Sequence, residues 1–85
     1  MTSDDVKYKR LKWRSRRGML ELDLLLLPFL EEVYRDLSDS DQSAYEKLLE
    51  QDDPDLLEWF SQKSIPEEED LKRLVLMILA RVQPA

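Results

Sequence analysis

Cysteine and histidine are both absent from this 85-residue chain, and glycine occurs only once. Without cysteine the chain has no disulfide, thiolate nucleophile or zinc–thiolate site, so a reducing compartment is its natural setting and we expect the cytoplasm. Without histidine it lacks the usual general base near neutral pH and the commonest metal ligand. A single glycine excludes a glycine-rich phosphate-binding loop. These absences favour a binding module over an enzyme.

Long hydrophobic runs are also missing. The most apolar stretch, residues 22–30, has nine residues and contains Asp23 and Pro28. A membrane-spanning helix needs about 20 mostly apolar residues, so a buried helix explains this stretch better. The first residues are polar and charged, without the apolar core of a signal peptide. We therefore expect neither membrane insertion nor a targeting segment.

Charge is unevenly distributed along the chain, whose formal net charge is −6. Residues 1–20 contain seven basic and two acidic residues, whereas residues 21–85 contain six basic and seventeen acidic residues. A basic segment ahead of an acidic body fits a nucleic acid, an anionic lipid or an acidic protein surface, or simple pairing of the segment with the body. Because the acidic body would repel phosphate, we expect no nucleic acid as partner and keep a nucleic-acid binder as the weakest alternative.

The composition predicts an all-α fold. Leucine, glutamate, lysine and arginine are abundant, and no apolar–polar alternation is long enough for a sheet. We expect a single domain over residues 1–85, a small five-helix bundle that is monomeric when free. Its first helix is basic and covers about residues 4–17. Gly18 follows the cations of the last turn and is expected to end that helix, because glycine adopts the left-handed conformation without steric cost.

The second helix is expected from residue 20 to about Leu37. Pro28 lies within it and lacks an N–H group, so a kink is expected there. The third helix follows a run of cap-forming residues, in which Asp39 and Gln42 have capping-box spacing.

The last two helices are expected to begin near prolines. Asp53 would cap the fourth helix, with Pro54 at its first position, and Pro66 would open the fifth. Apolar side chains at helical spacing predict the core, and Trp13 and Trp59 are assigned to packing as well. The predicted core consists of Leu22, Leu26, Phe29, Leu30, Val33, Tyr34, Leu37, Ala44, Tyr45, Leu48, Leu49, Leu56, Leu57, Phe60, Leu71, Leu74, Val75, Ile78, Leu79 and Val82.

The most unusual segment is Trp-Arg-Ser-Arg-Arg-Gly-Met-Leu-Glu-Leu-Asp at residues 13–23. Taken alone, Arg17, Gly18 and Glu21 suit a helix junction as a last-turn cation, a cap and a first-turn anion. The functional interpretation is an exposed corner with a forked arginine donor, a carboxylate acceptor and a bare backbone that a partner can approach closely. The residues alone leave both interpretations open. No acidic pair elsewhere has a companion group that would make it catalytic, so no catalytic or metal-binding residue is assigned.

Residues 16–23, Arg-Arg-Gly-Met-Leu-Glu-Leu-Asp, resemble the RRGMxELD signature of the FAD assembly factors of succinate dehydrogenase. Residues 11–13 match the aromatic position that precedes this motif in the family. Residues 48–60 are similar to the family's second block, an acidic turn that leads into a helix with leucine and tryptophan. The resemblance extends from about residue 8 to residue 82. Residues 61–64 depart from the family pattern because they lack a glycine.

The resemblance implies a five-helix protein that binds the flavoprotein subunit of succinate dehydrogenase and of the related fumarate reductase. It implies that the protein promotes covalent attachment of FAD there. The lack of a phosphate-binding loop argues that this chain does not bind FAD tightly itself. The nucleophilic histidine would belong to the flavoprotein, so the absence of histidine from this chain is compatible with the implied function. The family's functional motif carries over onto Arg17, Gly18 and Glu21, with Arg16 and Asp23 as flanking members of the partner-binding site.

The resemblance also implies a role for each motif residue. Arg17 would make a forked contact to the partner, Gly18 would permit close approach, and Glu21 would accept hydrogen bonds. Asp23 would be either a second contact or a first-turn helix charge, and the contact is preferred. The alternative function, also within the family resemblance, is an antitoxin-like interaction module that neutralises a small membrane-associated toxin.

Overall fold

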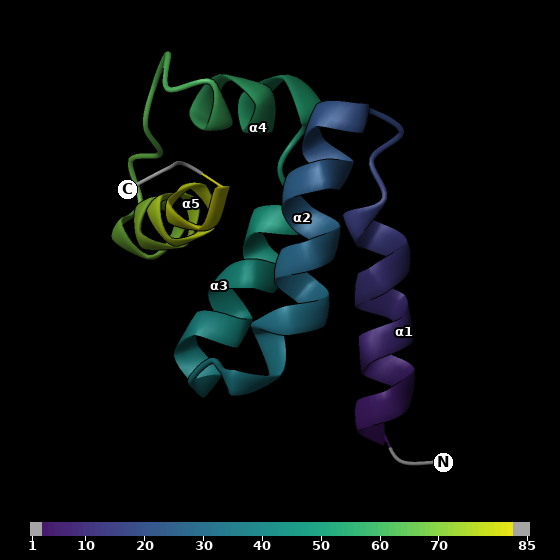
Figure 1. Ribbon diagram of the computed structural model, residues 1–85. Helices are drawn as coiled ribbons and strands as arrows, with labels where there is room; N and C mark the ends of the chain where they lie inside the picture. The colour runs from purple at the N-terminus through teal and green to yellow at the C-terminus, as the bar shows by residue number, and fades with distance from the viewer. Residues whose placement is uncertain (1–2, 83–85) are drawn as a thin grey trace.

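The computed structural model describes residues 3–82, and the side chains of residues 6–82. Within this part the chain forms five α-helices and contains no strand, so the predicted all-α fold is confirmed (Figure 1). The helices are α1 (Ser3–Ser15), α2 (Leu20–Glu32), α3 (Asp39–Leu49), α4 (Asp53–Phe60) and α5 (Glu69–Val82), with a 3₁₀ turn η1 (Tyr34–Asp36) between α2 and α3. None of the helices in residues 3–82 has both the length and the apolar character needed to cross a membrane.

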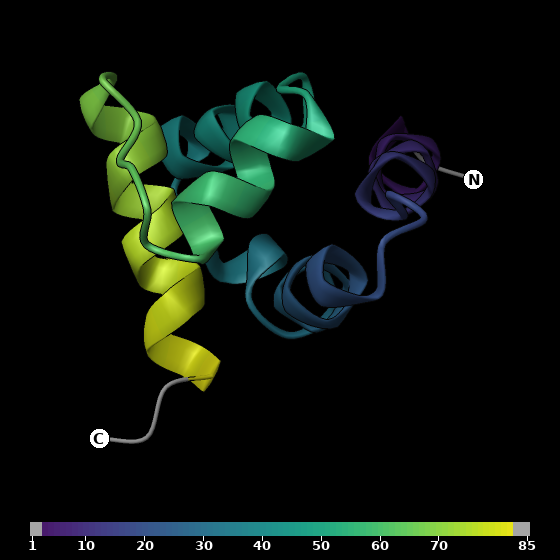
Figure 2. The same ribbon diagram turned by 90° about the horizontal axis from the view of Figure 1, so that it is seen from above.

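Helix α2 joins the two sides of the bundle. It packs against α1, α4 and α5, while α3 packs against α5 and more lightly against α1. Seen from above, α1 lies at one side of the molecule and α5 at the other, with α2 and α3 between them (Figure 2). The basic helix α1 therefore has one face against the bundle and the rest of its surface in solvent.

The core is formed mainly by the apolar side chains that the helical spacing predicts. Seventeen hydrophobic residues of the described part are buried: Leu11, Leu22, Leu26, Phe29, Leu30, Tyr34, Ala44, Tyr45, Leu48, Leu49, Leu56, Phe60, Leu71, Leu74, Val75, Ile78 and Leu79. Val33, Leu37 and Leu57 are partly buried against this core, as expected. Val82 is the exception, because at the end of α5 it is 54% exposed.

Two helix ends differ from the prediction. Helix α1 ends at Ser15 and not near residue 17, so Gly18 lies in the loop beyond the helix and is not its cap. Helix α2 contains Pro28, as expected, but ends at Glu32. The backbone then tightens into η1 instead of continuing as α-helix to Leu37.

The start of α3 is shifted by one residue from the predicted capping box. Its N-cap is Ser38, whose hydroxyl accepts a hydrogen bond from the Asp41 N–H at 3.2 Å. Asp39 is therefore the first helical residue. The Gln42 side chain donates to the Tyr34 carbonyl oxygen at 3.0 Å and so ties α3 to η1.

The last two helices also start at other residues than predicted. The N-cap of α4 is Asp52, so Asp53 and Pro54 are its first two helical residues. Helix α5 begins at Glu69, three residues after Pro66, which is buried in the connection between α4 and α5. A proline fits equally well in a connection, because it has no N–H group that needs a partner there.

A buried polar contact that the sequence analysis missed joins three helices. Ser15, at the end of α1, is 0% exposed, and its hydroxyl donates to the Leu11 carbonyl oxygen at 2.8 Å. The Tyr45 hydroxyl of α3 lies 2.8 Å from the Ser15 oxygen and 3.4 Å from the Leu26 carbonyl oxygen of α2. Ser15 therefore fixes the end of α1, from which the next loop starts.

We expect Ser15→Ala to lower the free energy of unfolding by about 1–3 kcal/mol, because it leaves the Tyr45 hydroxyl buried with only its longer contact. Ser43→Ala, at an exposed position of α3, serves as control and should change the free energy of unfolding by less than about 0.5 kcal/mol. Urea denaturation measures both. Equal stability of the two variants would contradict this role of Ser15.

Burial also raises the pKa of Tyr45, so the folded state holds its phenolic proton more tightly than the unfolded state. Stability from this group is therefore complete below the unfolded pKa of about 10 and is lost as the pH rises above it.

Candidate functional site

The candidate site is the corner, defined as residues 16–23, which comprises the loop after α1 and the first turn of α2. It lies at the end of the molecule where α4 begins (Figure 1). All five residues predicted for the partner-binding site fall within it: Arg16, Arg17, Gly18, Glu21 and Asp23. The structure divides them into residues that build the corner and residues that the corner exposes.

Arg17 builds the corner from inside. Only 15% of its side chain is exposed, and it reaches across to the connection between α3 and α4. Its Nε donates to Asp53 Oδ1 at 2.7 Å. Its Nη atoms donate to three carbonyl oxygens, those of Leu49 at 2.9 Å, Gln51 at 2.7 Å and Arg14 at 3.1 Å. Four of the five guanidinium N–H groups therefore have partners within the chain, and the forked contact that the motif implies is made internally.

Asp23 closes the loop from the other side. Its Oδ1 accepts a hydrogen bond from the backbone N–H of Arg17 at 2.8 Å. This contact joins the two ends of the corner, between residues that are six positions apart. Neither of the two roles predicted for Asp23 included such a contact. Arg17 and Asp23 together hold the residues between them in one conformation.

Gly18 lies at the exposed tip of the loop. Its φ is +79°, a conformation that other L-residues rarely adopt. A Cβ atom built on it would meet no atom within 4 Å. The backbone conformation therefore favours glycine here, while the space above it is open to a partner.

Glu21 and Arg16 are the exposed charges of the corner. Both are exposed, and neither side chain has a hydrogen bond or an ion pair with any residue that the structure describes. Glu21 lies at a groove of about 390 Å³ between the start of α2 and the end of α4, lined by Met19, Glu21, Leu57, Glu58, Ser61 and Lys63. A carboxylate at the edge of such a groove can accept a hydrogen bond from a partner.

The two tryptophans differ in their surroundings. Trp59 is half-buried against the core, which confirms its assignment to packing. Trp13 is 77% exposed, so its assignment to packing is wrong. Helix α1 turns Leu11 and Ser15 inward, and a residue two positions from either lies about 200° around the helix, on the outer face. Trp13 lines a shallow hollow with Lys9, Lys12 and Arg16.

Two further exposed apolar residues, one at the variable position of the motif and one directly after it, were not predicted as part of the site. Leu20 is 69% exposed and Leu24 is 61% exposed, and their spacing of four places them on one face of α2. Residues 22–30 are mostly leucine, so their composition alone predicts a helix that is buried on every side. Only the angular position of Leu24 on the helix, relative to the buried Leu22 and Leu26, indicates that its side chain faces outward. An apolar strip thus adjoins the charges of the corner.

The corner has the chemistry of a docking surface. No group of three or more acidic side chains able to hold a metal ion occurs among the residues that the structure describes. The exposed groups are an arginine, a carboxylate, a bare backbone and apolar side chains, all held on a braced loop. Such a set suits contact with another protein, so the fold and the site favour the class of small helical protein-binding modules.

Comparison with known proteins gives the family. Residues 9–82 match the model of the family described as flavinator of succinate dehydrogenase. The chain therefore belongs to this family, as the motif at residues 16–23 indicated. The family description names a flavinator, and relatives of this chain are named as assembly factors.

Individual relatives agree over nearly the whole chain. An FAD assembly factor of Pseudomonas aeruginosa is 56% identical over 82 residues, which cover 96% of this chain and 98% of the relative. A protein of the same name from Pseudomonas savastanoi pv. phaseolicola is 53% identical over 81 residues, covering 95% and 96%. The solution structure of a UPF0350 protein matches with a TM-score of 0.76 and 42% identity, covering 95% of this chain and 85% of that one.

Proposed function

We propose that the chain is an FAD assembly factor that binds the flavoprotein subunit of succinate dehydrogenase, and that of the related fumarate reductase. It promotes covalent attachment of FAD to these subunits, acting as a monomer in the cytoplasm. The names of relatives that share nearly its full length support this function. The observation that carries the proposal is the division of the motif, in which Arg17 has its partners inside the chain while Glu21 faces solvent.

The proposed mechanism is positioning. The corner docks between the FAD domain and the capping domain of the immature flavoprotein and holds them in the arrangement in which bound flavin reacts. As the family resemblance implies, the nucleophilic histidine belongs to the flavoprotein, so this chain needs no histidine of its own. Fixing two reacting groups in a productive geometry accelerates a reaction without any added catalytic group.

Each part of the corner has a place in this mechanism. Arg17 and Asp23 keep the loop in its binding conformation, so little order has to be gained on docking. Gly18 lets the partner backbone approach, and Glu21 accepts hydrogen bonds from partner donors. Leu20 and Leu24 add apolar contact beside them. FAD is handled through the flavoprotein, and this chain does not bind it tightly alone.

The proposal is tested by incubating apo-flavoprotein with FAD, with and without the wild-type chain. In-gel fluorescence after denaturation then reports the covalently bound flavin alone. We expect the fluorescence to increase with the chain present. Equal fluorescence in both samples, with both proteins folded, would overturn the proposed function.

Glu21→Ala separates docking from folding. Glu21 has no internal partner among the described residues, so its loss should change the free energy of unfolding by less than about 0.5 kcal/mol. Covalent flavinylation should nevertheless fall about tenfold, the loss expected when one charged hydrogen bond to the partner is removed. Glu67→Ala, at an exposed position in the connection before α5, is the matched control and should retain full activity. Full activity of Glu21→Ala would exclude Glu21 from the interface.

A further inference from the structure

The outer face of α1 presents an exposed tryptophan among cations. Trp13 is 77% exposed and lines a hollow of about 230 Å³ together with Lys9, Lys12 and Arg16. We call this space the Trp13 hollow. A single exposed hydrophobic residue is common at a protein surface, so the charges around Trp13 decide whether this one has a partner. The roles proposed for the corner do not include Trp13.

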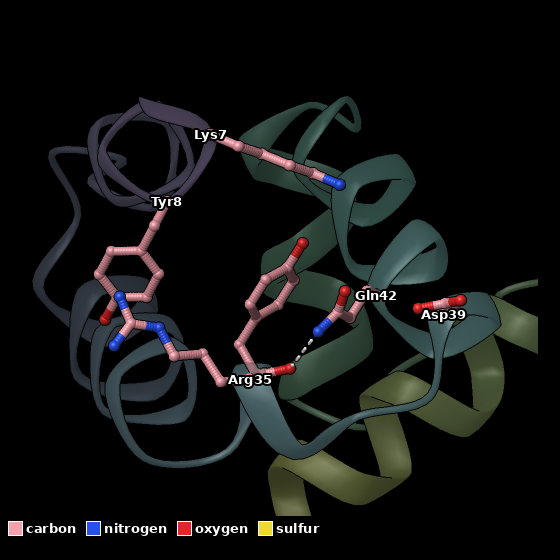
Figure 3. Close-up of a pocket in the computed structure, with 6 residues that line it drawn as sticks. Lys7, Tyr8, Arg35, Asp39 and Gln42 are labelled. Carbon is pink, nitrogen blue, oxygen red and sulfur yellow. Dashed lines mark hydrogen bonds between the residues drawn. The ribbon is translucent and has the colours of Figure 1, made fainter. Parts of the chain in front are cut away.

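On the side of α1 that faces the bundle, the cations are paired. Figure 3 shows Lys7 reaching from α1 towards α3. Its Nζ lies 3.3 Å from a Glu46 oxygen, and Lys12 Nζ lies 3.6 Å from Glu31 Oε1 of α2. Arg17 is held inside the corner. Part of the basic segment therefore pairs with the acidic body of the chain itself.

The other arginines of this segment have no such partner. Within the part of the chain that the structure describes, the side chains of Arg10, Arg14 and Arg16 form no ion pair and no hydrogen bond. Residues 6–20 contain no acidic residue that could offset them. Arg10 is exposed and lies three positions before Trp13, on the same face of α1. Arg16 is exposed in the turn that follows, where its N–H donates to the Trp13 carbonyl oxygen at 3.2 Å. The outer face of α1 therefore has positive charge that this chain leaves unbalanced.

The surroundings of the Trp13 hollow favour an acidic polypeptide over a larger anionic surface. Residues 21–85 contain seventeen acidic and six basic residues. A membrane or a nucleic acid presents a charged surface wider than one helix face, so it would also meet this acidic body, whereas a short acidic segment can contact α1 alone. Arg16 lines the hollow and also belongs to the corner, so a partner docked at the corner can extend into the hollow.

We propose that the Trp13 hollow binds an acidic segment of the flavoprotein. An apolar side chain of that segment packs against Trp13, and its carboxylates pair with Arg10 and Arg16. This inference rests on the proposed function, because it names the part of the partner that is recognised beside the corner. Tryptophan and arginine are enriched among the residues that dominate binding at protein interfaces. A guanidinium group also binds a carboxylate through two parallel hydrogen bonds.

Isothermal titration calorimetry with apo-flavoprotein tests the role of Trp13. Trp13→Ala should melt like the wild type, because the side chain is largely in solvent. Its dissociation constant for the flavoprotein should nevertheless rise about tenfold or more, the loss expected for a tryptophan that dominates an interface. Leu76→Ala, which truncates an exposed apolar residue of α5, is the matched control and should bind like the wild type. Equal affinity of Trp13→Ala and wild type would overturn the inference.

A pair of charge reversals tests whether the bound segment is acidic. Arg10→Glu and Lys72→Glu change the net charge equally, but Arg10 lies on the outer face of α1 and outside the corner, whereas Lys72 belongs to α5. Arg10→Glu should raise the dissociation constant several-fold and weaken its dependence on salt, because an attraction becomes a repulsion. Lys72→Glu should change neither. Equal effects of the two reversals would overturn the assignment of an acidic segment.

Photo-crosslinking separates failure of this inference from failure of the proposed function. A benzophenone amino acid at position 13 is irradiated with apo-flavoprotein, and mass spectrometry identifies the attached peptide. We expect a peptide in which aspartate or glutamate stands beside an apolar residue. A crosslink from position 21 but none from position 13, with flavinylation by the wild-type chain intact, would overturn this inference alone. A wild-type chain that does not bind the flavoprotein would overturn both.

Anionic vesicles test the competing occupant. Wild type and Trp13→Ala are sedimented with vesicles of phosphatidylcholine that contain phosphatidylglycerol, and we expect neither to sediment. Sedimentation of the wild type alone, together with equal affinity of both for the flavoprotein, would overturn the inference and assign the Trp13 hollow to a lipid surface.

Discussion

Replacing Arg17 by alanine is expected to lower the free energy of unfolding by about 3 kcal/mol, the largest stability effect at any motif residue. The change removes four hydrogen bonds and leaves the Asp53 carboxylate and the Leu49 and Gln51 carbonyl oxygens without their donor. These acceptors are only partly accessible, because the Asp53 side chain is 33% exposed. Water can restore part of the lost bonding, which keeps the effect below the sum of four charged hydrogen bonds.

Urea denaturation of matched variants tests this role of Arg17. Arg17→Lys should recover little of the lost stability. The three guanidinium nitrogens donate to different acceptors, and the single nitrogen of an ammonium group cannot reach all of them. Arg16→Ala is the control, since its exposed side chain has no partner in the described part of the chain, and should cost less than about 0.5 kcal/mol. If Arg17→Ala were as stable as Arg16→Ala, the internal bracing of the corner would be refuted.

Gly18→Arg is expected to abolish covalent flavinylation while the protein remains folded. A side chain at a φ of +79° costs about 1–2 kcal/mol in backbone strain, which a folded domain of this kind can absorb. The open space around the glycine means that the Cβ of the new side chain meets no atom within 4 Å beyond its chain neighbours. On the proposed mechanism it would instead occupy the volume through which the flavoprotein approaches.

Two smaller substitutions separate backbone strain from obstruction. Gly18→Asn should keep most of the stability, because asparagine tolerates the left-handed conformation, yet reduce flavinylation through its added bulk. Gly18→Ala should lower the free energy of unfolding by about 1 kcal/mol, because alanine has to adopt the same positive φ. It should reduce flavinylation less than Gly18→Asn does. The in-gel flavin fluorescence of each variant gives the order of activity. A folded Gly18→Arg variant with full activity would contradict close approach at this residue.

The helical pattern of the sequence predicts most of the core but not the ends of the helices. Leu71, Leu74 and Ile78 recur at helical spacing and are buried in α5 as expected. The caps of α3 and α4 are each shifted by one residue, because Ser38 and Asp52 stand next to equally good cap formers. Spacing alone does not choose between adjacent residues of the same type.

The internal role of Arg17 was not predictable from local sequence. Its partners in the connection between α3 and α4 lie 32–36 residues away, so only the packing of α1, α2 and α4 brings them together. The exposure of Trp13 could have been predicted locally, from its angle on the helix relative to Leu11. The prediction that it packs in the core followed instead from the usual burial of tryptophan. The motif was thus found from the sequence, while the division of its residues between bracing and binding required the fold.

The central claim, that the corner contacts the flavoprotein, is tested most directly by site-specific photo-crosslinking. A photoreactive benzophenone amino acid replaces Glu21 in one sample and Glu67 in the other, and each protein is irradiated with apo-flavoprotein and FAD. Both positions are exposed, so accessibility does not distinguish them. We predict a crosslink to the flavoprotein from position 21 and none from position 67. Crosslinking from position 67 alone would place the interface away from the corner and contradict the account.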